Sequence, residues 1–277
     1  MLKLLERTIA TLDTRFVLVS PPGASMPESF WNASADPERH KRLVRGAQRL
    51  RGRVYLEDGA IQSDQLSADG LHQTREDDRS WHLLFTDGRD RVTACTWLLE
   101  HPVETSFEDL RVHQCPLAQS REWRPKVWYA VEWELARARA EGLAYTEIGG
   151  WAVARESRCS SEGLVLALAA YSLGRCLGGA IGVTTATVRH SSATILKRLG
   201  GVHLHAKDEE IPPYYDPRYG CTMEILTFDS RRPSHKYVSL IDLLHRKLTE
   251  VPVVMQNGFA GLPTLDPYRQ TANRATA

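Results

Sequence analysis

The residues best suited to chemistry in this sequence lie between positions 144 and 177, where a strand-like run, a polar loop and a helix-forming run follow one another. The loop contributes an arginine and three small residues: Arg158, Ser160, Ser161 and Gly163. The first turn of a helix leaves backbone N–H groups without partners, and the helix dipole adds positive charge there. Such a loop suits the binding of a phosphate group. The alternative is an ordinary helix cap formed by Ser160 or Ser161, with Glu162 favouring the first turn.

The strand that leads into this loop contains the adjacent glycines Gly149 and Gly150. Glycines weaken an ordinary strand, so the pair indicates a bulge or a close approach of the backbone to another group.

The elements that must position these residues can be predicted from hydrophobic periodicity and turn signals. An Asp-Gly turn at 86–90 joins two strand-like runs, which is a hairpin signal. The expected helices are 39–53 (basic and amphipathic), 127–141, 164–177, 191–199 and 236–248, and the expected strands are 80–85, 91–99, 144–154, 180–187, 202–205 and 221–229. This alternation predicts a mixed α/β sheet in one layer with helices packed on it.

The chain organisation that we expect has three parts. Residues 1–38 form an N-terminal arm, residues 39–235 form the main domain, and residues 236–277 form a C-terminal helix and a tail that is loosely ordered after Gly258.

The composition excludes several classes of function. The 277 residues include 35 Lys and Arg against 34 Asp and Glu, a net charge of +1, so we expect no nucleic-acid partner. We expect no membrane span and a cytoplasmic location, because no apolar run is long enough and the N-terminus is charged too early for a secretory signal. Five scattered cysteines without a C-x-x-C pair indicate neither a disulfide framework nor a metal site.

Two motifs together resemble the GNAT acyltransferase superfamily. Val153, Arg158, Ser161 and Gly163 have the register of its acyl-CoA pyrophosphate loop, with Ser161 at the first glycine position. Residues 190–201 resemble its following helix, which ends in a Leu-Gly pair. The resemblance covers roughly residues 42 to 229. It implies an α/β (α+β) fold with a GNAT-like central mixed, partly antiparallel sheet, a splayed central strand and helices on both faces.

A narrower resemblance is to the branch that contains acyl-homoserine-lactone synthases and N-acyl amino acid synthases. It rests on residues 51–55, 76–80, 92–99 and 147–153. In the lactone synthases an arginine follows the strand glutamate by three residues, whereas Gly150 follows Glu147 here, which argues against lactone chemistry.

The resemblance implies an N-acyltransferase that moves a medium or long acyl chain from acyl carrier protein or acyl-CoA to the amine of an amino acid or similar small molecule. The alternatives are an autoinducer-type synthase and a catalytically silent module that binds the acyl carrier.

The resemblance also suggests roles for individual residues. Glu147 is the expected base for the amine, with a structural ion pair as its alternative. Backbone N–H groups at Trp151, Ala152 and Val153 are expected to stabilise the oxyanion. The expected donor-binding residues are Val153, Arg155, Arg158, Ser160, Ser161, Gly163 and Arg189. Leu196 stands where many GNATs have an acid tyrosine, so the acid is left open among Tyr214, Tyr215, His190 and no residue at all.

Acyl-chain and carrier contacts complete the expectations. We expect Trp81, Phe85, Trp97 and Arg53 to bind substrate, with Leu83, Leu99, Trp128 and Trp151 as further candidates for an acyl tunnel; the alternative for most of the apolar ones is a packed core. A basic rim for an acyl carrier protein is expected from segment 39–53 with Arg155, Arg158, Arg189, Lys197 and Arg198, and its alternative is a solvated helix face.

Overall fold

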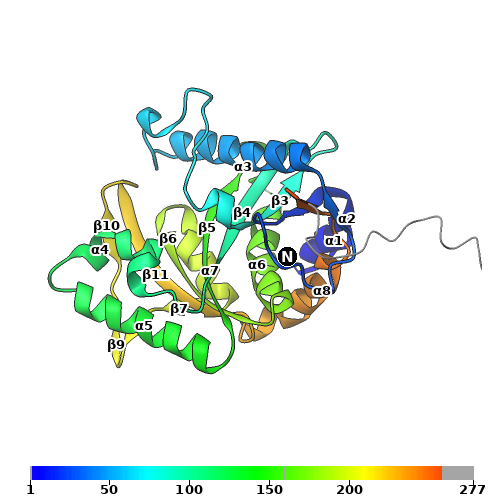
Figure 1. The fold of residues 1–277 in the computed structure, drawn as a ribbon. Coiled ribbons are helices and arrows are strands. Elements are labelled where there is room, and N and C mark those ends of the chain that lie inside the picture. The colour runs from blue at the N-terminus through cyan, green and yellow to red at the C-terminus, as the bar shows by residue number, and fades with distance from the viewer. Residues whose placement is uncertain (1, 159, 258–277) are drawn as a thin grey trace, which may run out of the picture.

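One sheet of ten strands organises the part of the chain that the structure, a computed structural model, describes: residues 2–158 and 160–257 (Figure 1). The strand order is β10 (Tyr214–Asp216), β11 (Cys221–Asp229), β6 (Ala180–Thr187), β5 (Ala144–Val153), β4 (Val92–His101), β3 (Trp81–Thr86), β1 (Phe16–Val19), β12 (Val253–Met255) and β2 (Ala33–Ala35). In addition β7 (Val202–His203) pairs with β11, while β8 (His205–Ala206) and β9 (Glu209–Glu210) form a separate small hairpin.

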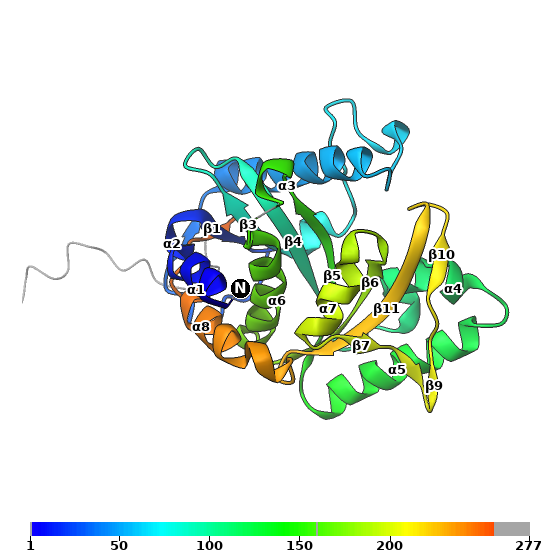
Figure 2. The ribbon, with the colours of Figure 1, turned by 180° about the vertical axis from the view of Figure 1, so that it is seen from behind.

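Helices cover both faces of this sheet. On one face lie α3 (Pro37–Glu57) and α5 (Arg124–Ala140), and on the other lie α1 (Leu2–Ala10), α6 (Glu162–Cys176), α7 (Ser192–Leu199) and α8 (Val238–Leu248) (Figure 2). The short helices α2 (Leu12–Arg15) and α4 (Pro116–Gln119) complete the set in the described chain. The predicted fold class, a mixed and partly antiparallel sheet between helices, is confirmed.

The long helix α3 begins where its sequence provides a cap. The Asp36 carboxylate accepts a hydrogen bond from the backbone N–H of Arg39 at 2.9 Å, and Pro37 occupies the first turn. Its buried face contains Leu43, Ala47 and other apolar residues that pack against the sheet. The helix therefore presents one fixed side to β4 and β5, which matters for the site.

The central strand β5 is splayed from its neighbour, as predicted. It pairs with β6 in parallel only over Ala144–Glu147, and beyond that point the two strands separate. Thr184 Oγ1 donates to the carbonyl of Ile148 at 2.8 Å at the start of the gap.

The two glycines of β5 meet both predictions made for them. The register with β4 shifts between Cys95 and Trp97, which marks a bulge, and Gly150 has a positive φ of 66°. The Trp97 indole lies against both glycines, so a Cβ at Gly149 or Gly150 would overlap its ring atoms. Glycine is required here by close approach at both positions and by backbone conformation at Gly150.

The two ends of the described chain meet in the sheet. We expected residues 1–38 to form an arm, but Phe16–Val19 is a fully buried strand that pairs with β3 on one side and β12 on the other. The C-terminal helix is α8, and the chain returns from it to the sheet as β12. The expected loose tail after Gly258 lies outside the described residues.

A membrane-crossing helix is not found among the described residues, since none of their helices combines the necessary length and apolar character.

Candidate functional site

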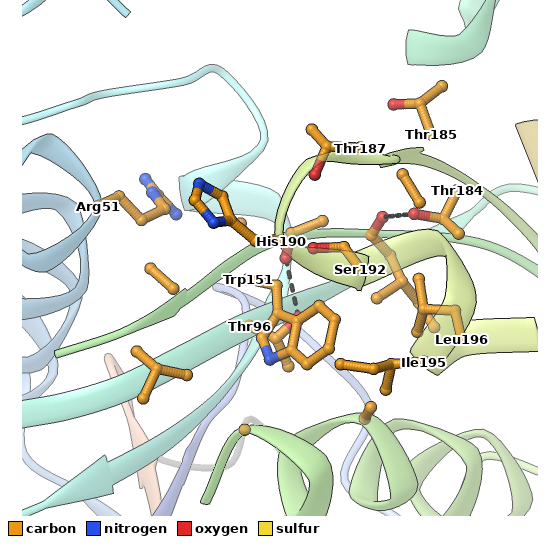
Figure 3. A pocket seen from close by; sticks show the side chains of 18 of the residues that line it. Arg51, Thr96, Trp151, Thr184, Thr185, Thr187, His190, Ser192, Ile195 and Leu196 are labelled. Carbon is orange, nitrogen blue, oxygen red and sulfur yellow. Dashed lines mark hydrogen bonds between the residues drawn. The ribbon is translucent and has the colours of Figure 1, made fainter. Parts of the chain in front are cut away.

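A cavity of about 540 Å³ opens where β5 and β6 separate, and residues from both faces of the sheet line it (Figure 3). Arg51 reaches it from α3, whereas Ile195 and Leu196 reach it from α7. The half on the α6 and α7 side is largely apolar and is formed by residues including Leu164, Ala167, Ala170, Ile195, Leu196, Leu226 and Phe228. The gap in the sheet therefore joins an apolar half to a polar half.

The loop between β5 and α6 forms one end of the cavity. Arg158, Ser160 and Gly163 line it, as expected for phosphate-type contacts. A Cβ at Gly163 would lie 3.1 Å from Val153 Cγ2, so the small residue lets the first turn of α6 pack closely against β5. The capping alternative is also present, because Ser160 Oγ accepts from the backbone N–H of Glu162 at 3.2 Å. Capping and ligand binding are compatible, since a helix start exposes several N–H groups.

Three other residues expected to bind the donor either lie outside the cavity lining or have their polar groups hydrogen-bonded within the protein. Arg155 is exposed and outside the cavity lining. The Ser161 hydroxyl bonds to the hydroxyl of Thr8 in α1 at 2.6 Å and is also outside it. Arg189 lines the cavity, but its guanidinium donates to the backbone carbonyls of Asp58 and Gly220.

On the α3 side, two adjacent carboxylates each hold one cavity arginine. Asp77 binds the guanidinium of Arg51 at 2.6 Å, with both side chains 1% exposed. Glu76 binds Arg111 at 2.7 Å, and the Arg111 guanidinium lies over the Trp97 ring at 5.4 Å. Burial acts to raise the pKa of each carboxyl, but the neighbouring guanidinium charges and hydrogen bonds outweigh it and lower the pKa of both. The two arginines are therefore fixed, positively charged walls of the cavity.

Tyr55 and His72 lie beside these arginines. The Tyr55 hydroxyl donates to the carbonyl of Trp151 at 3.3 Å, so α3 holds the splayed part of β5. Its pKa is raised, chiefly by burial. Burial and then the charge of Arg51 lower the pKa of His72 to about 4, so this imidazole is neutral near pH 7. The polar half of the cavity thus presents two cations, a phenol and a neutral imidazole.

Glu147 is not brought to the cavity wall. Its carboxylate is 5% exposed and accepts from His101 Nε2 at 3.0 Å and from the backbone N–H groups of Arg111 and Val112 at 2.9 and 3.0 Å. Its role as a base stays a prediction, and its contacts are those of a structural carboxylate that fixes the segment bearing Arg111.

The expected role of backbone N–H groups at an oxyanion stays a prediction, and the backbone places the N–H of Val153 on the gap side of β5. The N–H of Ala154 bonds to the carbonyl of Thr93 in β4 at 2.8 Å. Successive N–H groups of a strand point to opposite edges, so the N–H of Val153 faces the gap that β6 leaves open. Trp151, Ala152 and Val153 all line the cavity, and the Trp151 indole N–H is buried without a partner among the described residues.

Of the expected substrate-binding residues, the structure brings Trp97 and, from the wider tunnel set, Trp151 to the cavity. Trp81 and Phe85 are buried in β3 and pack against Phe30 and Phe16, on the far side of β4 from the gap. Arg53 is exposed and points away, because Arg51 and not Arg53 shares the buried face of α3. Leu83 and Leu99 are core residues, and Trp128 is 45% exposed on α5.

Of the positions expected to supply the general acid, only some line the cavity. Leu196 and His190 line the cavity, whereas Tyr214 and Tyr215 do not.

Several basic residues of the expected carrier-protein rim are paired within the chain. Arg39 binds Asp90 at 3.0 Å, Arg51 is buried, and Lys197 binds Glu224 at 2.7 Å. Arg198 is exposed.

Sequence reasoning missed Arg51, Tyr55, His72 and Arg111 as cavity residues. For α3 a signal existed, because Arg51 lies four residues after the buried Ala47 and three before Val54, on the apolar face of the helix. Residues 76–80 are part of the segments that carry the resemblance, but the pairing of Asp77 with Arg51 and of Glu76 with Arg111 depends on tertiary structure.

The chain was compared with known proteins. No family model and no curated protein matches it. Among solved structures it is similar to the CoA-dependent acyl-homoserine lactone synthase BjaI with SAM and isopentyl-CoA, with 14% identity, a TM-score of 0.52, and 90% of this chain and 95% of that chain covered. BjaI with MTA also has a TM-score of 0.52 with the same coverage, at 15% identity. FeeM, an N-acyl amino acid synthase from uncultured soil microbes, has 15% identity and a TM-score of 0.40 over 71% of this chain and 87% of its own.

The similarity to BjaI spans nearly the whole of both chains at an identity too low to carry substrate or mechanism. The sheet with its splayed β5, together with this similarity, shows that the chain has a GNAT-like fold, which it shares with the acyl-homoserine lactone synthase BjaI.

Proposed function

We propose that this protein is an N-acyltransferase that moves a medium or long acyl chain from an acyl carrier protein or acyl-CoA thioester to the amine of an amino acid or similar small molecule. The observation that carries the proposal is the cavity itself. It joins a phosphate-type loop, an apolar half and a half with two fixed arginines through one gap in the sheet. A volume of about 540 Å³ lies in the range of small-molecule sites.

The two halves suit the two substrates. The loop with Arg158 and Gly163 suits the phosphate of a phosphopantetheine arm, and the apolar half between α6 and α7 suits the acyl chain. Arg51 and Arg111 suit a carboxylate on the acceptor, because guanidinium groups bind carboxylates with charge-assisted hydrogen bonds. An amino acid carries both that carboxylate and the amine.

The reaction requires attack of the neutral amine nitrogen on the thioester carbonyl carbon, loss of an N–H proton and cleavage of the C–S bond. The N–H of Val153 at the open edge and the unpartnered indole N–H of Trp151 are the donors that we assign to the developing oxyanion or to the donor's carbonyl groups. The thiol leaves readily as a thiolate, since its pKa is low compared with that of an amine, so Leu196 at the tyrosine position is compatible with transfer.

A second candidate is an autoinducer-type synthase, and one observation favours it. The family arginine is replaced by Gly150, but Nη1 of Arg51 lies 3.1 Å from the point where a Cβ at position 150 would start. A guanidinium therefore stands beside this position, supplied by α3 in place of β5.

The test is incubation with acyl-CoA thioesters of graded chain length, and with loaded acyl carrier protein, in the presence of pooled amino acids and SAM. Mass spectrometry then distinguishes a linear N-acyl amino acid from an N-acyl lactone. We expect the linear product and stoichiometric thiol release. Donor binding without any acylated amine would overturn the enzyme proposal in favour of an acyl-carrier-binding module.

A matched pair of variants links the product to the apolar half of the cavity. Leu196→Trp fills space beside Ile195 and should abolish transfer of long chains before short ones. Val202→Trp is the control, because Val202 is 55% exposed on β7 and does not line the cavity. If both variants transfer acyl chains of each length equally well, the acyl chain binds outside this half of the cavity.

A further inference from the structure

A carboxylate of α3 already occupies the arginine of the phosphate-type loop. Asp58, the residue that ends α3, places Oδ1 3.0 Å from Nη2 of Arg158 and 3.9 Å from Nε2 of His190. All three residues line the cavity. Asp58 therefore spans the mouth of the cavity, from the helix on one face of the sheet to the loops at the ends of β5 and β6.

This carboxylate is held in place and is not a loose surface group. The backbone carbonyl of Asp58 accepts a hydrogen bond from Arg189, whose guanidinium also donates to the carbonyls of Tyr219 and Gly220. The Asp58 side chain is 21% exposed. Arg189 thus connects the end of α3 with the turn between β10 and β11 through hydrogen bonds. Its guanidinium faces the carbonyl oxygens of these two segments.

The opposite side of the mouth has a constrained backbone. His190 and the next residue, Ser191, both have positive φ, at 57° and 62°. Two consecutive non-glycine residues in the left-handed region are uncommon and cost free energy that surrounding contacts must offset. This conformation places His190 at the cavity, toward Asp58.

We propose that Asp58 determines which phosphopantetheine donor the site accepts, by weakening the binding of donors in proportion to their negative charge. The inference rests on the proposed function, since it takes the loop at Arg158 as the donor's phosphate site. A phosphate that binds Arg158 must compete with the Asp58 carboxylate, which lies 3.0 Å from the guanidinium. The negative charges of the phosphate and of Asp58 also repel each other. CoA carries several phosphates, whereas the arm of a carrier protein carries one. Asp58 therefore disfavours CoA relative to carrier-bound phosphopantetheine.

The test measures three probes of increasing charge by isothermal titration: pantetheine, 4′-phosphopantetheine and CoA. In Asp58→Asn we expect CoA to bind roughly three- to tenfold more tightly than in the wild type, 4′-phosphopantetheine to gain less, and pantetheine to be unchanged. Asparagine has nearly the shape of aspartate and is tolerated where helices end, so the change removes charge and little else.

Glu57→Gln is the matched control, because it removes the same charge one residue earlier from an exposed side chain of the same helix. An equal gain in Glu57→Gln would assign the effect to overall charge, and a CoA affinity unchanged in Asp58→Asn would overturn the role of Asp58. Melting temperatures of both variants check the fold. Failure of the proposed function has a different signature, namely that neither the wild type nor Asp58→Asn binds any of the probes.

Discussion

At the scale of single residues, Glu147 shows how a residue type at the expected position can have another task. Its carboxylate accepts hydrogen bonds from the backbone N–H groups of Arg111 and Val112 and from His101, so both of its oxygens have partners. A carboxylate that accepts several hydrogen bonds is poorly placed to take a proton from an amine in a cavity that it does not line. Its contacts instead hold the segment from which the Arg111 guanidinium reaches the cavity.

Glu147→Gln distinguishes these two roles. If Glu147 positions Arg111, the free energy of unfolding of the protein should fall by about 1–3 kcal/mol in this variant. The reason is that a glutamine amide has one acceptor oxygen, whereas the N–H groups around Glu147 bind two carboxylate oxygens. The acceptor KM should rise more than kcat falls, because Arg111 is displaced. Urea unfolding and steady-state kinetics measure both effects.

The opposite pattern would restore Glu147 as the base: a fall in kcat of about a hundredfold or more at unchanged stability and acceptor KM. Glu104→Gln, at an exposed position of the loop after β4, is the control and should change neither quantity.

The sequence predicts the residues of the loop between β5 and α6 better than the arginines on the α3 side of the cavity. Arg158, Ser160 and Gly163 are close in sequence and belong to one strand–loop–helix unit, so local pattern is enough to bring them together. Arg51 and Arg111 are 60 positions apart and meet the cavity only because Glu76 and Asp77 hold them. Such a contact has no local signature, whereas the helical period of α3 does separate the buried Arg51 from the exposed Arg53, which the sequence analysis predicts at the substrate.

At the scale of elements, β5 is shaped as much by Trp97 as by its own residues. The indole lies across Gly149 and Gly150, and the register shift with β4 falls at the same point. The strand continues to pair with β4 after the bulge, with the N–H of Val153 facing the gap. The side chain on β4 and the two glycines on β5 therefore act as one unit.

Gly149→Ala should destabilise the protein by about 1–3 kcal/mol, because the added methyl group overlaps the Trp97 ring and one of the two must move. In a Trp97→Leu background the same change should cost clearly less, since the ring is absent. A double-mutant cycle in urea measures this coupling. Equal costs in the two backgrounds would mean that the indole does not require glycine at this position.

The segment from the acidic stretch into β3 gives stability a defined pH dependence. His82 is fully buried, and its Nε2 lies 2.7 Å from the carbonyl of Asp77. Burial lowers the pKa of His82 to about 4, against the opposing influence of Asp77, while Arg51 and His40 lower it further. Between pH 6.5 and pH 4 the unfolded chain therefore binds a proton that the folded chain does not.

The free energy of unfolding should accordingly fall as pH is lowered from about 6.5 to about 4, by up to about 3 kcal/mol from His82 alone. His72, whose pKa is also about 4, adds to the fall in the same window. Asp77 and Glu76 reduce the free energy of unfolding only at more acidic pH, because the pKa of each carboxyl is lowered in the folded protein.

Urea unfolding between pH 7 and pH 4 measures this slope. His82→Gln should flatten it and His205→Gln, at an exposed position, should leave it unchanged. An equally steep slope in His82→Gln would show that the buried imidazole is not its source.

Most of the longer elements could be predicted from periodicity, whereas short strands such as β1, β2, β10 and β12 could not. The strands 180–187 and 221–229 agree with β6 and β11 residue for residue, because both are long and bounded by clear turn signals. By contrast β12 and β2 have three residues each, and their pairing joins positions near 33 and near 255. Runs this short acquire their structure from partners that are distant in sequence, which a local pattern does not contain.

At the scale of the whole molecule, the near-neutral charge hides an internal pairing of opposite charges around the cavity. Asp77 and Glu76 hold Arg51 and Arg111 at the α3 side of the cavity, whereas Asp58 occupies Arg158 at the loop between β5 and α6. The guanidinium groups of Arg51 and Arg111 are thereby oriented before any ligand enters. Preorganised charge of this kind is what binding and stabilising a developing charge require.

The first and last described elements belong to the same hydrophobic core as α6. Leu5 and Ile9 of α1, Leu18 of β1 and Val253 of β12 pack in one hydrophobic cluster with α6, whose first turn forms the phosphate-type loop. Arg15 also binds Glu162 at that first turn, at 2.5 Å. Destabilising β1 or β12 should therefore also destabilise the start of α6 at the cavity, although β12 does not line the cavity.

Val253→Ala tests this coupling. Val253 is 0% exposed, so removing two methyl groups should cost about 1–2.5 kcal/mol, and the whole chain should still unfold in one transition at a lower temperature. Hydrogen exchange should quicken in β1 and at the start of α6 as well as in β12, because they share one core. Gln256→Ala, at the exposed position just after β12, is the control. A separate early transition confined to β1, β2 and β12 would instead make these strands an independent unit added to the rest of the sheet, with a cavity that does not depend on them.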